Sequence, residues 1–200
     1  MENQQQPEVI NLMSKSAEKI LDTAEDLFNQ HSFVAVGVDL IRDQSGCSKT
    51  TLYTYFKNKQ QLILAVLEQR DLRFRQQLEQ YVAASHGLEA VQKIFEWHMQ
   101  WFQRDDFKGC LFVRAVAESS AQDQAIISLA QAHKQWVRQL IEQHCQNFSN
   151  ADAISQMSYH LLEGLISRFL VEGYDAKIAQ NSQASLVQFI TLSNTQPNLL

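Results

Sequence analysis

The sequence predicts an all-α protein, and three observations support this fold class. The 200-residue chain has only two prolines, at positions 7 and 197, so no proline interrupts a helix between them. Apolar residues recur at the spacing of amphipathic helices, while runs that alternate with a period of two are missing. Hydrophobic residues make up 45% and charged residues 20% of the chain, as in ordinary globular proteins. We therefore expect about nine helices.

The N-terminal part of the sequence predicts four of these helices, after a polar arm at residues 1–13. The first is amphipathic, and the second ends at Gly46, the residue type best suited to a helix C-cap. Ser48 has the side chain of an N-cap for a short third helix, and Asn58 can cap a long fourth one. The expected helices span residues 14–31, 38–45, 49–55 and about 58–84.

Helical periodicity continues through the rest of the chain. Short polar or glycine-containing segments such as "RDDFKG" and "FSNAD" separate the apolar stretches. The sequence contains no internal repeat. The expected helices span residues 88–103, 108–120, 122–147, 151–173 and 182–193.

The composition excludes several classes of protein. No apolar run approaches the ~18 residues that a membrane span needs, and the N-terminus lacks a signal-peptide pattern. The three cysteines are odd in number and widely spaced, which favours reduced thiols in a cytoplasm. No paired metal-ligand spacing, CxxC motif or glycine-rich phosphate loop occurs. We therefore expect a cytoplasmic protein with no membrane partner, no metal and no cofactor.

One short window, residues 48–59, has an unusual composition for a chain with a formal net charge of −5. It is rich in lysines, hydroxyl groups and tyrosines, and no acidic residue occurs between Asp43 and Glu68. Two short helices joined by a glycine-containing turn outline a helix-turn-helix, whose second helix enters the major groove of DNA. Phosphates repel carboxylates and attract lysines and hydroxyls. We therefore expect a DNA-binding surface here, with Leu52 and Phe56 facing inward.

The order of these residues resembles the TetR/AcrR family of repressors. The stretch "GVDLIRDQSGCSKTTLYTYFKNKQQL", from Gly37 to Leu62, follows the family pattern, and "KILDTAEDLFNQHSF" is similar to its first helix. The resemblance covers about residues 14–67. It implies a three-helix DNA-binding domain at 14–60, followed by a larger helical domain for ligand sensing and dimerisation at 61–200.

By position, the resemblance also implies which residues contact DNA. Ser48, Tyr53, Tyr55 and Lys59 would bind phosphates, and Lys49, Thr50 and Thr54 would lie near base edges. The sequence departs from the pattern before the second helix, where Val36 and Gly37 provide no hydroxyl group. We expect Arg42 to replace that contact. The full set of expected DNA-binding residues is Arg42, Ser48, Lys49, Thr50, Tyr53, Thr54, Tyr55 and Lys59.

The resemblance further implies a small-molecule effector, and an aromatic-rich region offers candidate residues for its site. Five residues between 94 and 102 form a wide stripe on one helix, with an imidazole within it. They fit either a cavity wall for a hydrophobic or aromatic effector or an ordinary helical core. In the first case His98 or Glu118 would orient the ligand. The candidate residues are Trp97, His98, Trp101, Phe102, Cys110, Phe112 and Glu118.

Cys110 has a second interpretation, as a redox-sensing thiol. It follows Gly109 at the expected start of a helix, where the helix dipole would lower the pKa of the thiol. The alternative is an inert, buried cysteine.

The last two expected helices are apolar around most of their circumference, which indicates burial on several sides. The resemblance implies a homodimer built through a four-helix bundle, with two helices from each chain. Small residues would allow a close approach between these helices. The candidate interface residues are Met157, Leu161, Gly164, Leu165, Phe169, Leu186 and Phe189.

Together these observations favour a transcriptional repressor that binds a palindromic operator as a homodimer and is released by a small molecule. A helix-turn-helix protein without an effector, acting as a DNA-binding or partner-docking module, is the main alternative. An enzyme would need a nucleophile with its base or a metal set, and the sequence shows no such motif, so we expect no enzymatic activity. A cavity between residues 88 and 147 would distinguish an effector-responsive protein from an effector-independent one.

Overall fold

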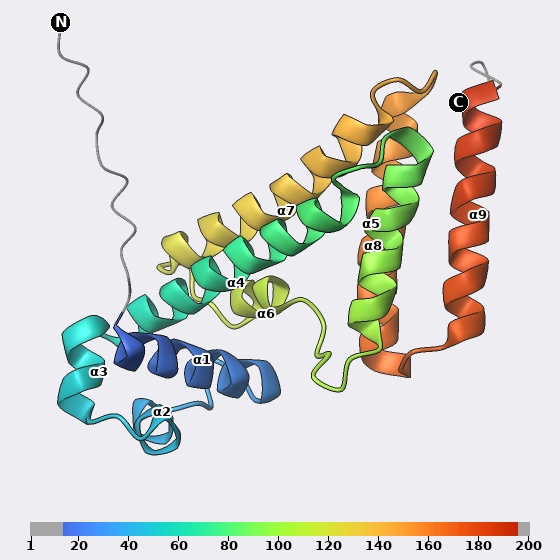
Figure 1. The fold of residues 1–200 in the computed structure, drawn as a ribbon. Coiled ribbons are helices and arrows are strands. Elements are labelled where there is room, and N and C mark those ends of the chain that lie inside the picture. The colour runs from blue at the N-terminus through green and yellow to red at the C-terminus, as the bar shows by residue number, and fades with distance from the viewer. Residues whose placement is uncertain (1–13, 196–200) are drawn as a thin grey trace, which may run out of the picture. The chain divides into compact units, whose positions relative to one another are not determined.

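The computed structural model describes residues 14–195, in which nine α-helices and no strands occur (Figure 1). The all-α fold predicted from the sequence is therefore confirmed. The predicted polar arm at residues 1–13 lies outside the described residues. The chain divides into two compact units, one up to Val66 and one from Leu67 onward.

The first unit packs three helices around a small apolar core: α1 (Lys15–Gln30), α2 (Val38–Ser45) and α3 (Lys49–Tyr55). The starts of α1 and α3 have a physical cause, since the side chains of Ser14 and Ser48 accept hydrogen bonds from backbone N–H groups in the first turns of these two helices. Core side chains come from all three helices and from the segments that flank them: Leu21, Phe28, Phe33, Ile41, Leu52 and Phe56.

The fourth helix, α4 (Lys59–Val82), begins in the first unit and ends in the second. The backbone N–H of Gln61 donates to Oδ1 of Asn58 at 2.8 Å, so Asn58 caps the helix as the sequence predicted. With 24 residues, α4 is about 36 Å long.

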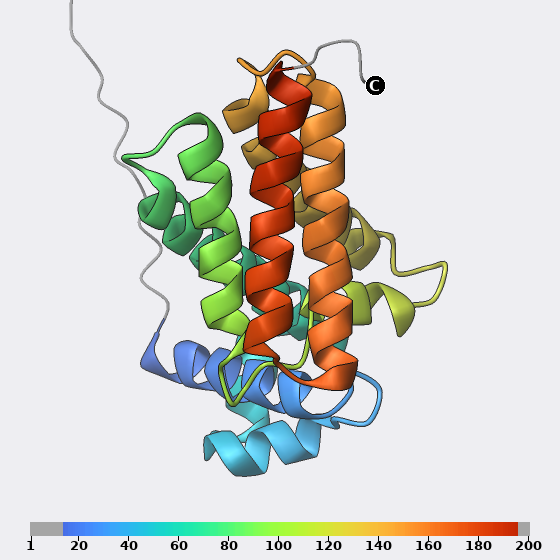
Figure 2. The ribbon, with the colours of Figure 1, turned by 90° about the vertical axis from the view of Figure 1, so that its right-hand side faces the viewer.

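The second unit contains the C-terminal part of α4 and five further helices: α5 (Gly87–Phe102), α6 (Leu111–Ala117), α7 (Gln124–Cys145), α8 (Ala151–Glu172) and α9 (Ala176–Thr195). Helix α7 packs against α5, α6 and α8, while α9 packs against α5 and α8. Figure 2 shows α8 and α9 side by side along most of their lengths. The core shared by α5, α7, α8 and α9 includes Ile94, Ile141, Leu162 and Ile190, none of which is more than 1% exposed. None of the described helices is long and apolar enough to cross a bilayer.

Two helices in this unit start three or more residues away from the expected position. Helix α9 begins at Ala176 rather than at residue 182, because Oδ1 of Asp175 accepts hydrogen bonds from the N–H groups of Lys177 and Ile178 at 2.8 and 3.0 Å. Helix α6 begins at Leu111 rather than at residue 108, because Gly109 has a φ of 74°, which is incompatible with a right-handed helix. The expected span of 108–120 therefore shrinks to seven residues.

Candidate nucleic-acid interface and effector pocket

The turn between α2 and α3 is defined by two residues with opposite backbone requirements. Gly46 ends α2 with φ 62° and ψ 18°, in the left-handed region that glycine enters without steric cost. Ser48 then adopts an extended conformation, and its Oγ accepts from the backbone N–H of Thr51 at 3.0 Å. The chain therefore leaves one short helix and starts the next within three residues, as a helix-turn-helix requires.

Helix α3 presents its polar side chains outward and its apolar ones inward. Leu52 is fully buried and Phe56 is 5% exposed, which confirms the expected inward face. The outward-facing positions include Tyr53 and Tyr55, whose exposures of 42% and 43% are high for aromatic residues. The other expected contacts on or beside α3 are also exposed: Ser48, Lys49, Thr50 and Thr54.

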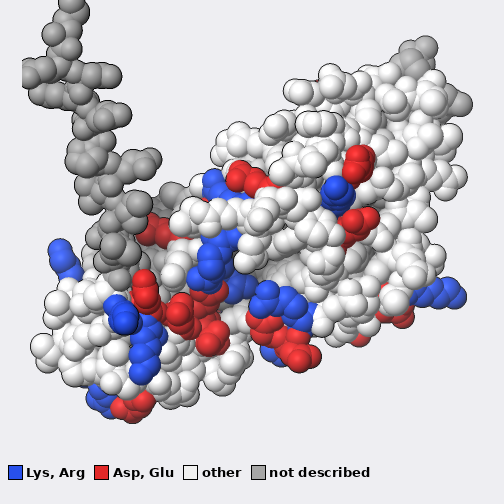
Figure 3. Space-filling model, viewed as in Figure 1, with Lys and Arg blue, Asp and Glu red and all other residues white. Residues whose placement is uncertain are grey.

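Ion pairs hold the two basic residues expected to contact DNA from α2 and α3. The Nη1 atom of Arg42 lies 2.9 Å from Oδ1 of Asp39, and its Nη2 lies 2.7 Å from Oδ1 of Asp43. The ammonium of Lys49 contacts the same Asp39 oxygen at 3.2 Å. Blue and red side chains accordingly lie next to one another on the N-terminal unit at the lower left of Figure 3. Exposed pairs of this kind are weak, so phosphates can replace the carboxylates as partners.

Internal hydrogen bonds orient several other expected contact residues. Ser14 Oγ donates to the hydroxyl of Tyr55 at 2.6 Å, so helix α1 fixes the direction of that side chain. Thr54 Oγ1 donates to the carbonyl oxygen of Thr50 at 2.8 Å. The ammonium of Lys59, at the start of α4, donates to the carbonyl oxygen of Val34 at 3.4 Å. The expected DNA-binding residues thus belong to one compact unit, and their role in binding stays a prediction.

The aromatic stripe on α5 packs into the core of the second unit. The ring centroid of Trp97 lies 4.9 Å from that of Phe74, and Trp101 lies 4.9 Å from Phe107. Phe102 is 3% exposed, and His98 is 1% exposed. These four side chains do not line the pockets described below. In this structure the stripe therefore corresponds to the core alternative that the sequence left open.

His98 is a neutral core residue in this arrangement. Its Nδ1 donates to the carbonyl oxygen of Ile94 at 2.7 Å, within its own helix. Burial lowers the pKa of the imidazole to about 4, despite the opposing effect of that hydrogen bond. The nearby charges of Lys134 and His133 lower the pKa further.

A pocket of about 480 Å³ lies between α6, α7 and α8. Only Phe112 among the expected effector residues lines it, whereas Glu118 caps the C-terminus of α6. Three residues that the sequence did not indicate add polarity: Lys134, Arg138 and Tyr159. The remaining lining residues are mainly apolar: Val113, Val116, Ala117, Ala130 and Gln131.

The polar side of this pocket is held by two specific interactions. The Lys134 ammonium contacts both carboxylate oxygens of Glu163 at 2.7 Å. The guanidinium of Arg138 lies 5.8 Å from the ring centroid of Tyr159, in cation–π geometry. A ligand here would therefore meet an apolar surface beside fixed cationic groups.

Cys110 belongs to a polar cluster that the sequence did not reveal. The side chain of His133 on α7 lies within hydrogen-bonding reach of the Cys110 thiol, and its Nδ1 lies 2.8 Å from Oδ1 of Asp71 on α4. Burial by itself would raise the pKa of the thiol, but His133 and the charge of Lys134 lower it to about 7. The lowered pKa was expected from the start of a helix, but an imidazole from α7 is the larger cause. Because Asp71 and His133 are 62 residues apart, sequence spacing could not indicate their contact.

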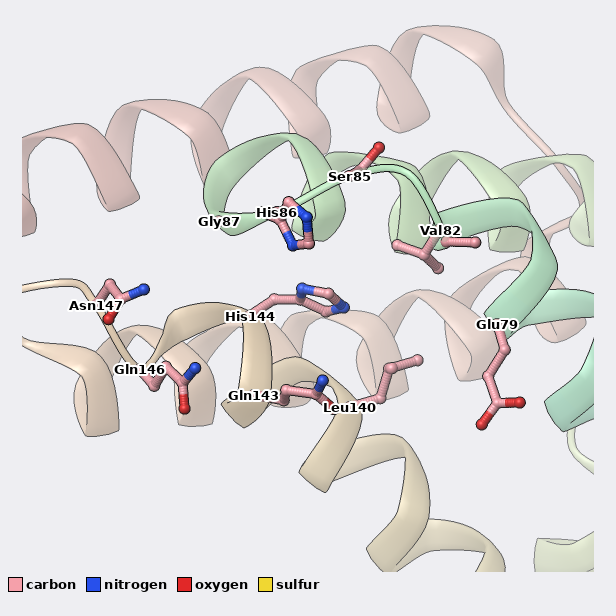
Figure 4. A pocket seen from close by; sticks show the side chains of 11 residues that line it. Glu79, Val82, Ser85, His86, Gly87, Leu140, Gln143, His144, Gln146 and Asn147 are labelled. Carbon is pink, nitrogen blue, oxygen red and sulfur yellow. The ribbon is translucent and has the colours of Figure 1, made fainter.

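A second pocket, of about 360 Å³, lies where α4, α5 and the end of α7 meet (Figure 4). The imidazoles of His86 and His144 face one another across it, with ring centroids 6.5 Å apart. Burial and the charge of His86 lower the pKa of His144. No group of three or more His, Cys, Asp or Glu residues suited to a metal ion occurs in residues 14–195. A third pocket, of about 400 Å³, lies between α5 and α9 and includes Leu186.

The expected dimer-interface residues on α8 and α9 fall into two groups. Leu165, Phe169 and Leu186 are at most 3% exposed and pack inside their own unit. A second copy of the chain would have to contact the remaining candidates, of which Met157 is 50% exposed. The others are partly buried or exposed: Leu161, Gly164 and Phe189. The interface stays a prediction, with its candidates narrowed to this outer group.

Comparisons with known proteins identify the N-terminal unit. Residues 20–66 match the family model described as "Bacterial regulatory proteins, tetR family". A segment of 63 residues is 35% identical to an uncharacterized HTH-type transcriptional regulator of Mycobacterium tuberculosis. This segment covers 32% of the present chain and 31% of the relative, so the chain matches about a third of the length of that protein.

Solved structures share the fold across both units. SCO4454, a TetR-family transcriptional regulator from Streptomyces coelicolor, has a TM-score of 0.75 at 23% identity, covering 92% of this chain and 97% of that chain. The reduced form of NemR from Escherichia coli has a TM-score of 0.76 at 21% identity, covering 86% of this chain and 96% of that chain. The family model describes regulatory proteins rather than enzymes. The resemblance noted in the sequence is thus confirmed: residues 20–66 match the tetR family of bacterial regulatory proteins, and both units have the fold of solved TetR-family regulators.

Proposed function

We propose that this protein is a transcriptional repressor that binds a palindromic DNA operator as a homodimer and leaves it when a small molecule binds. The observation that carries the proposal is the helix-turn-helix, in which α3 exposes an acid-free row of lysine, threonine and tyrosine side chains. Such a helix fits the major groove of DNA, with its N-terminal residues toward the bases.

Contacts to DNA would divide by residue type. Ser48, Tyr53, Tyr55 and Lys59 are suited to phosphates, which fix the orientation of the protein but carry no sequence information. Lys49, Thr50 and Thr54 extend from the helix that would enter the groove and would read base edges. Arg42 would exchange its carboxylate partners on α2 for a phosphate. Substitution of a phosphate contact should therefore weaken binding to all DNA sequences, whereas substitution of a base contact should change the preferred sequence.

A homodimer follows from the geometry of DNA, because one short helix reads only a few base pairs. Two recognition helices related by a twofold axis can reach major grooves one helical turn apart, about 34–36 Å. Among the exposed large apolar side chains, four lie on α8 and α9, which supports a self-complementary surface there. These residues are Met157, Leu170, Val171 and Leu192.

The effector site that we propose is the pocket between α6, α7 and α8. Its volume of about 480 Å³ is suited to a small organic molecule. Phe112 and the valines of α6 favour an apolar or aromatic body, and Lys134 and Arg138 favour a ligand that carries a carbonyl or anionic group. The pocket argues against the effector-independent alternative. Because α4 belongs to both units, its displacement is the simplest route from ligand to recognition helix.

The proposed function can be tested by selecting DNA sequences that bind the full-length protein from a random pool. A palindromic consensus with half-sites about one helical turn apart is expected. Thr50→Ala should change the selected sequence, whereas Lys59→Ala should weaken binding to all sequences and reduce the salt slope by about one unit. A protein that selects no sequence and binds duplex DNA no better than its Lys59→Ala variant would contradict the proposal.

A further inference from the structure

The residues Cys110, His133 and Asp71 lie outside the expected DNA-binding set, yet they are arranged as in a reactive site. All three residues belong to the second unit. Asp71 lies on α4, His133 lies on α7, and Cys110 immediately precedes α6. Asp71 and His133 are 7% and 4% exposed, whereas Cys110 is only partly buried. The two orienting groups are thus buried, whereas the residue that carries the thiol keeps part of its surface exposed.

The hydrogen bonds give each member of the cluster a defined task. Asp71 contacts Nδ1 of His133 at 2.8 Å and is itself fixed by the guanidinium of Arg75 at 2.6 Å. With Nδ1 directed to a carboxylate, Nε2 is the ring atom left for the thiol of Cys110. The ring of Phe112 stacks on the imidazole, with centroids 3.8 Å apart and planes 12° apart, and so restrains its orientation. The Asp71 carboxylate therefore orients His133, and His133 can act as a base for the Cys110 thiol, which is the nucleophile.

We propose that Cys110 is the nucleophile of a covalent binding site for soft carbon electrophiles, the class of α,β-unsaturated carbonyl compounds, with His133 as its acid–base partner. The adjoining pocket shares Phe112 and Lys134 with the surroundings of the thiol. Its apolar surface suits the hydrocarbon part of such a molecule. The Lys134 ammonium is placed to attract the carbonyl oxygen, on which negative charge develops.

The reaction is a conjugate addition that balances without a further reagent. His133 takes the proton of the thiol, and the sulfur electron pair forms a bond to the β-carbon of the electrophile. The π electrons of the carbon–carbon double bond move toward the carbonyl and give an enolate. The imidazolium of His133 then donates its proton to the α-carbon. The products are a thioether and a neutral imidazole, with no net oxidation or reduction.

The positions of the other thiols argue for this chemistry rather than for a disulfide. Cys145 lies twelve residues beyond His133 on α7, which corresponds to about 18 Å along the helix. It is fully buried, and burial raises its thiol pKa to about 12. Cys47 belongs to the other unit, where its thiol donates to the carbonyl oxygen of Ser16 at 3.9 Å. Within its own unit, an oxidised Cys110 would thus lack the nearby resolving thiol that reversible disulfide sensors use.

The chemistry can be tested on the full-length protein with cyclohexenone as the probe and peptide mapping by mass spectrometry as the readout. Cys110 should be alkylated first. Cys47, which is also partly buried but hydrogen-bonded to a carbonyl group, is the matched control and should react more slowly. Cys145 should react only after unfolding. The rate at Cys110 should rise with pH and reach half its maximum near pH 7. Earlier alkylation of Cys47 or Cys145 would overturn the proposal.

Two variants separate the role of the imidazole from a merely structural one. His133→Gln should slow the alkylation of Cys110 at about pH 6.5 by about fivefold or more, because a return of the thiol pKa toward ~8.5 lowers the thiolate fraction about 25-fold and higher basicity recovers part of the loss. Asp71→Asn, which acts only through His133, should move the midpoint of the pH profile upward. An unchanged profile in a folded His133→Gln variant would refute the pairing. Should that variant not fold, the pH profile of the wild-type protein still decides.

A regulatory consequence rests on the proposed function: alkylation of Cys110 should weaken operator binding, and Cys110→Ser should bind the operator but ignore cyclohexenone. Alkylation without any effect on DNA binding would refute this consequence while leaving the covalent site intact. Failure of the unmodified protein to bind any operator would instead refute the proposed function, and the mapping result would stand independently.

Discussion

The pKa of a single side chain in this protein depends on the groups that surround it. His98 and His133 illustrate the contrast, because both are imidazoles buried in the same unit. Burial dominates for His98 and lowers its pKa to about 4. Burial also acts on His133, but the hydrogen bonds with Asp71 and Cys110 outweigh it and raise the pKa of that imidazole. Partners rather than burial alone therefore decide the direction in which the pKa of each histidine shifts.

The low pKa of His98 makes the folded state sensitive to acid. In the unfolded chain the imidazole binds a proton near pH 6.5, whereas in the folded protein it does so only near pH 4. Stability is therefore fully present above pH 6.5 and falls as the pH drops toward 4, by about 3 kcal/mol. His98→Asn keeps a donor for the carbonyl of Ile94 but does not titrate, so its free energy of unfolding should vary less with pH across this range. Denaturant titrations at several pH values test this, and equally steep profiles would contradict it.

Asp39 is expected to restrain the DNA-binding surface. Its carboxylate pairs with both Arg42 and Lys49, and it would lie close to phosphates in a complex. Asp39→Asn should tighten binding to non-specific duplex DNA by about two- to fivefold at low salt, with less effect at high salt. Fluorescence anisotropy at about 50 and about 200 mM salt measures this. Glu18→Gln on α1 removes the same charge outside these ion pairs and serves as the control.

At the scale of secondary-structure elements, backbone geometry at the helix ends determines how the functional groups are presented. Gly46 sets the turn between α2 and α3, and Gly109 places Cys110 before α6. A Cβ atom added at Gly109 would lie 2.8 Å from Cδ2 of Leu170, so both its φ and its surroundings favour glycine. Both positions join elements that carry proposed contacts, so strain there should affect function as well as stability.

The chain provides a matched pair of glycines for testing the turn. Gly46→Ala should destabilise the N-terminal unit by about 1–2 kcal/mol, because an alanine in the left-handed region is strained. Space is not limiting, since the added Cβ would lie 3.5 Å from Nζ of Lys19. Gly37→Ala is the control, with φ −84° and nothing within 4 Å of the added atom, and should be close to neutral. Thermal unfolding compares the two, and equal losses would contradict this account of the turn.

At the scale of the whole molecule, the proposed function depends on a second copy of the chain and on the surface that contacts it. The apolar residues of α8 and α9 form two groups. Some fill the core of the protomer, and others remain exposed on its surface. Leu165 belongs to the first group at 3% exposure and Met157 to the second at 50%. The two residues therefore allow core packing and assembly to be perturbed separately.

Met157→Glu should give a folded monomer, because it places a charge in the proposed seam without removing a core side chain. Leu165→Ala should instead lower the stability of the protomer by about 2–5 kcal/mol through loss of packing. Gln80→Glu, an exposed position on α4, controls for the added charge. Sedimentation and operator binding report the outcome. If Met157→Glu stays dimeric and binds the operator fully, the interface lies elsewhere.

The amino-acid sequence alone determined the helical fold and most helix ends, because both depend on local chemistry. The absence of interior proline, the caps at Ser48 and Asn58, and the glycine at Gly46 act within a few residues along the chain. The family resemblance could be recognised for the same reason, since its motif lies in one continuous stretch that ends in the first part of α4. The start of α9 was misplaced because the capping role of Asp175 was overlooked.

Only the tertiary structure decided which of several apolar faces packs inward and which residues meet across the chain. The stripe from Trp97 to Phe102 fits a core or a pocket equally well in sequence, and packing against Phe74, Phe107 and Phe169 made it core. His133 and Asp71 come together from positions 62 residues apart, and that contact depends on how α4 and α7 pack. A thiol at position 110 can be recognised in the sequence, but its ionisation depends on charges that only folding brings within hydrogen-bonding distance.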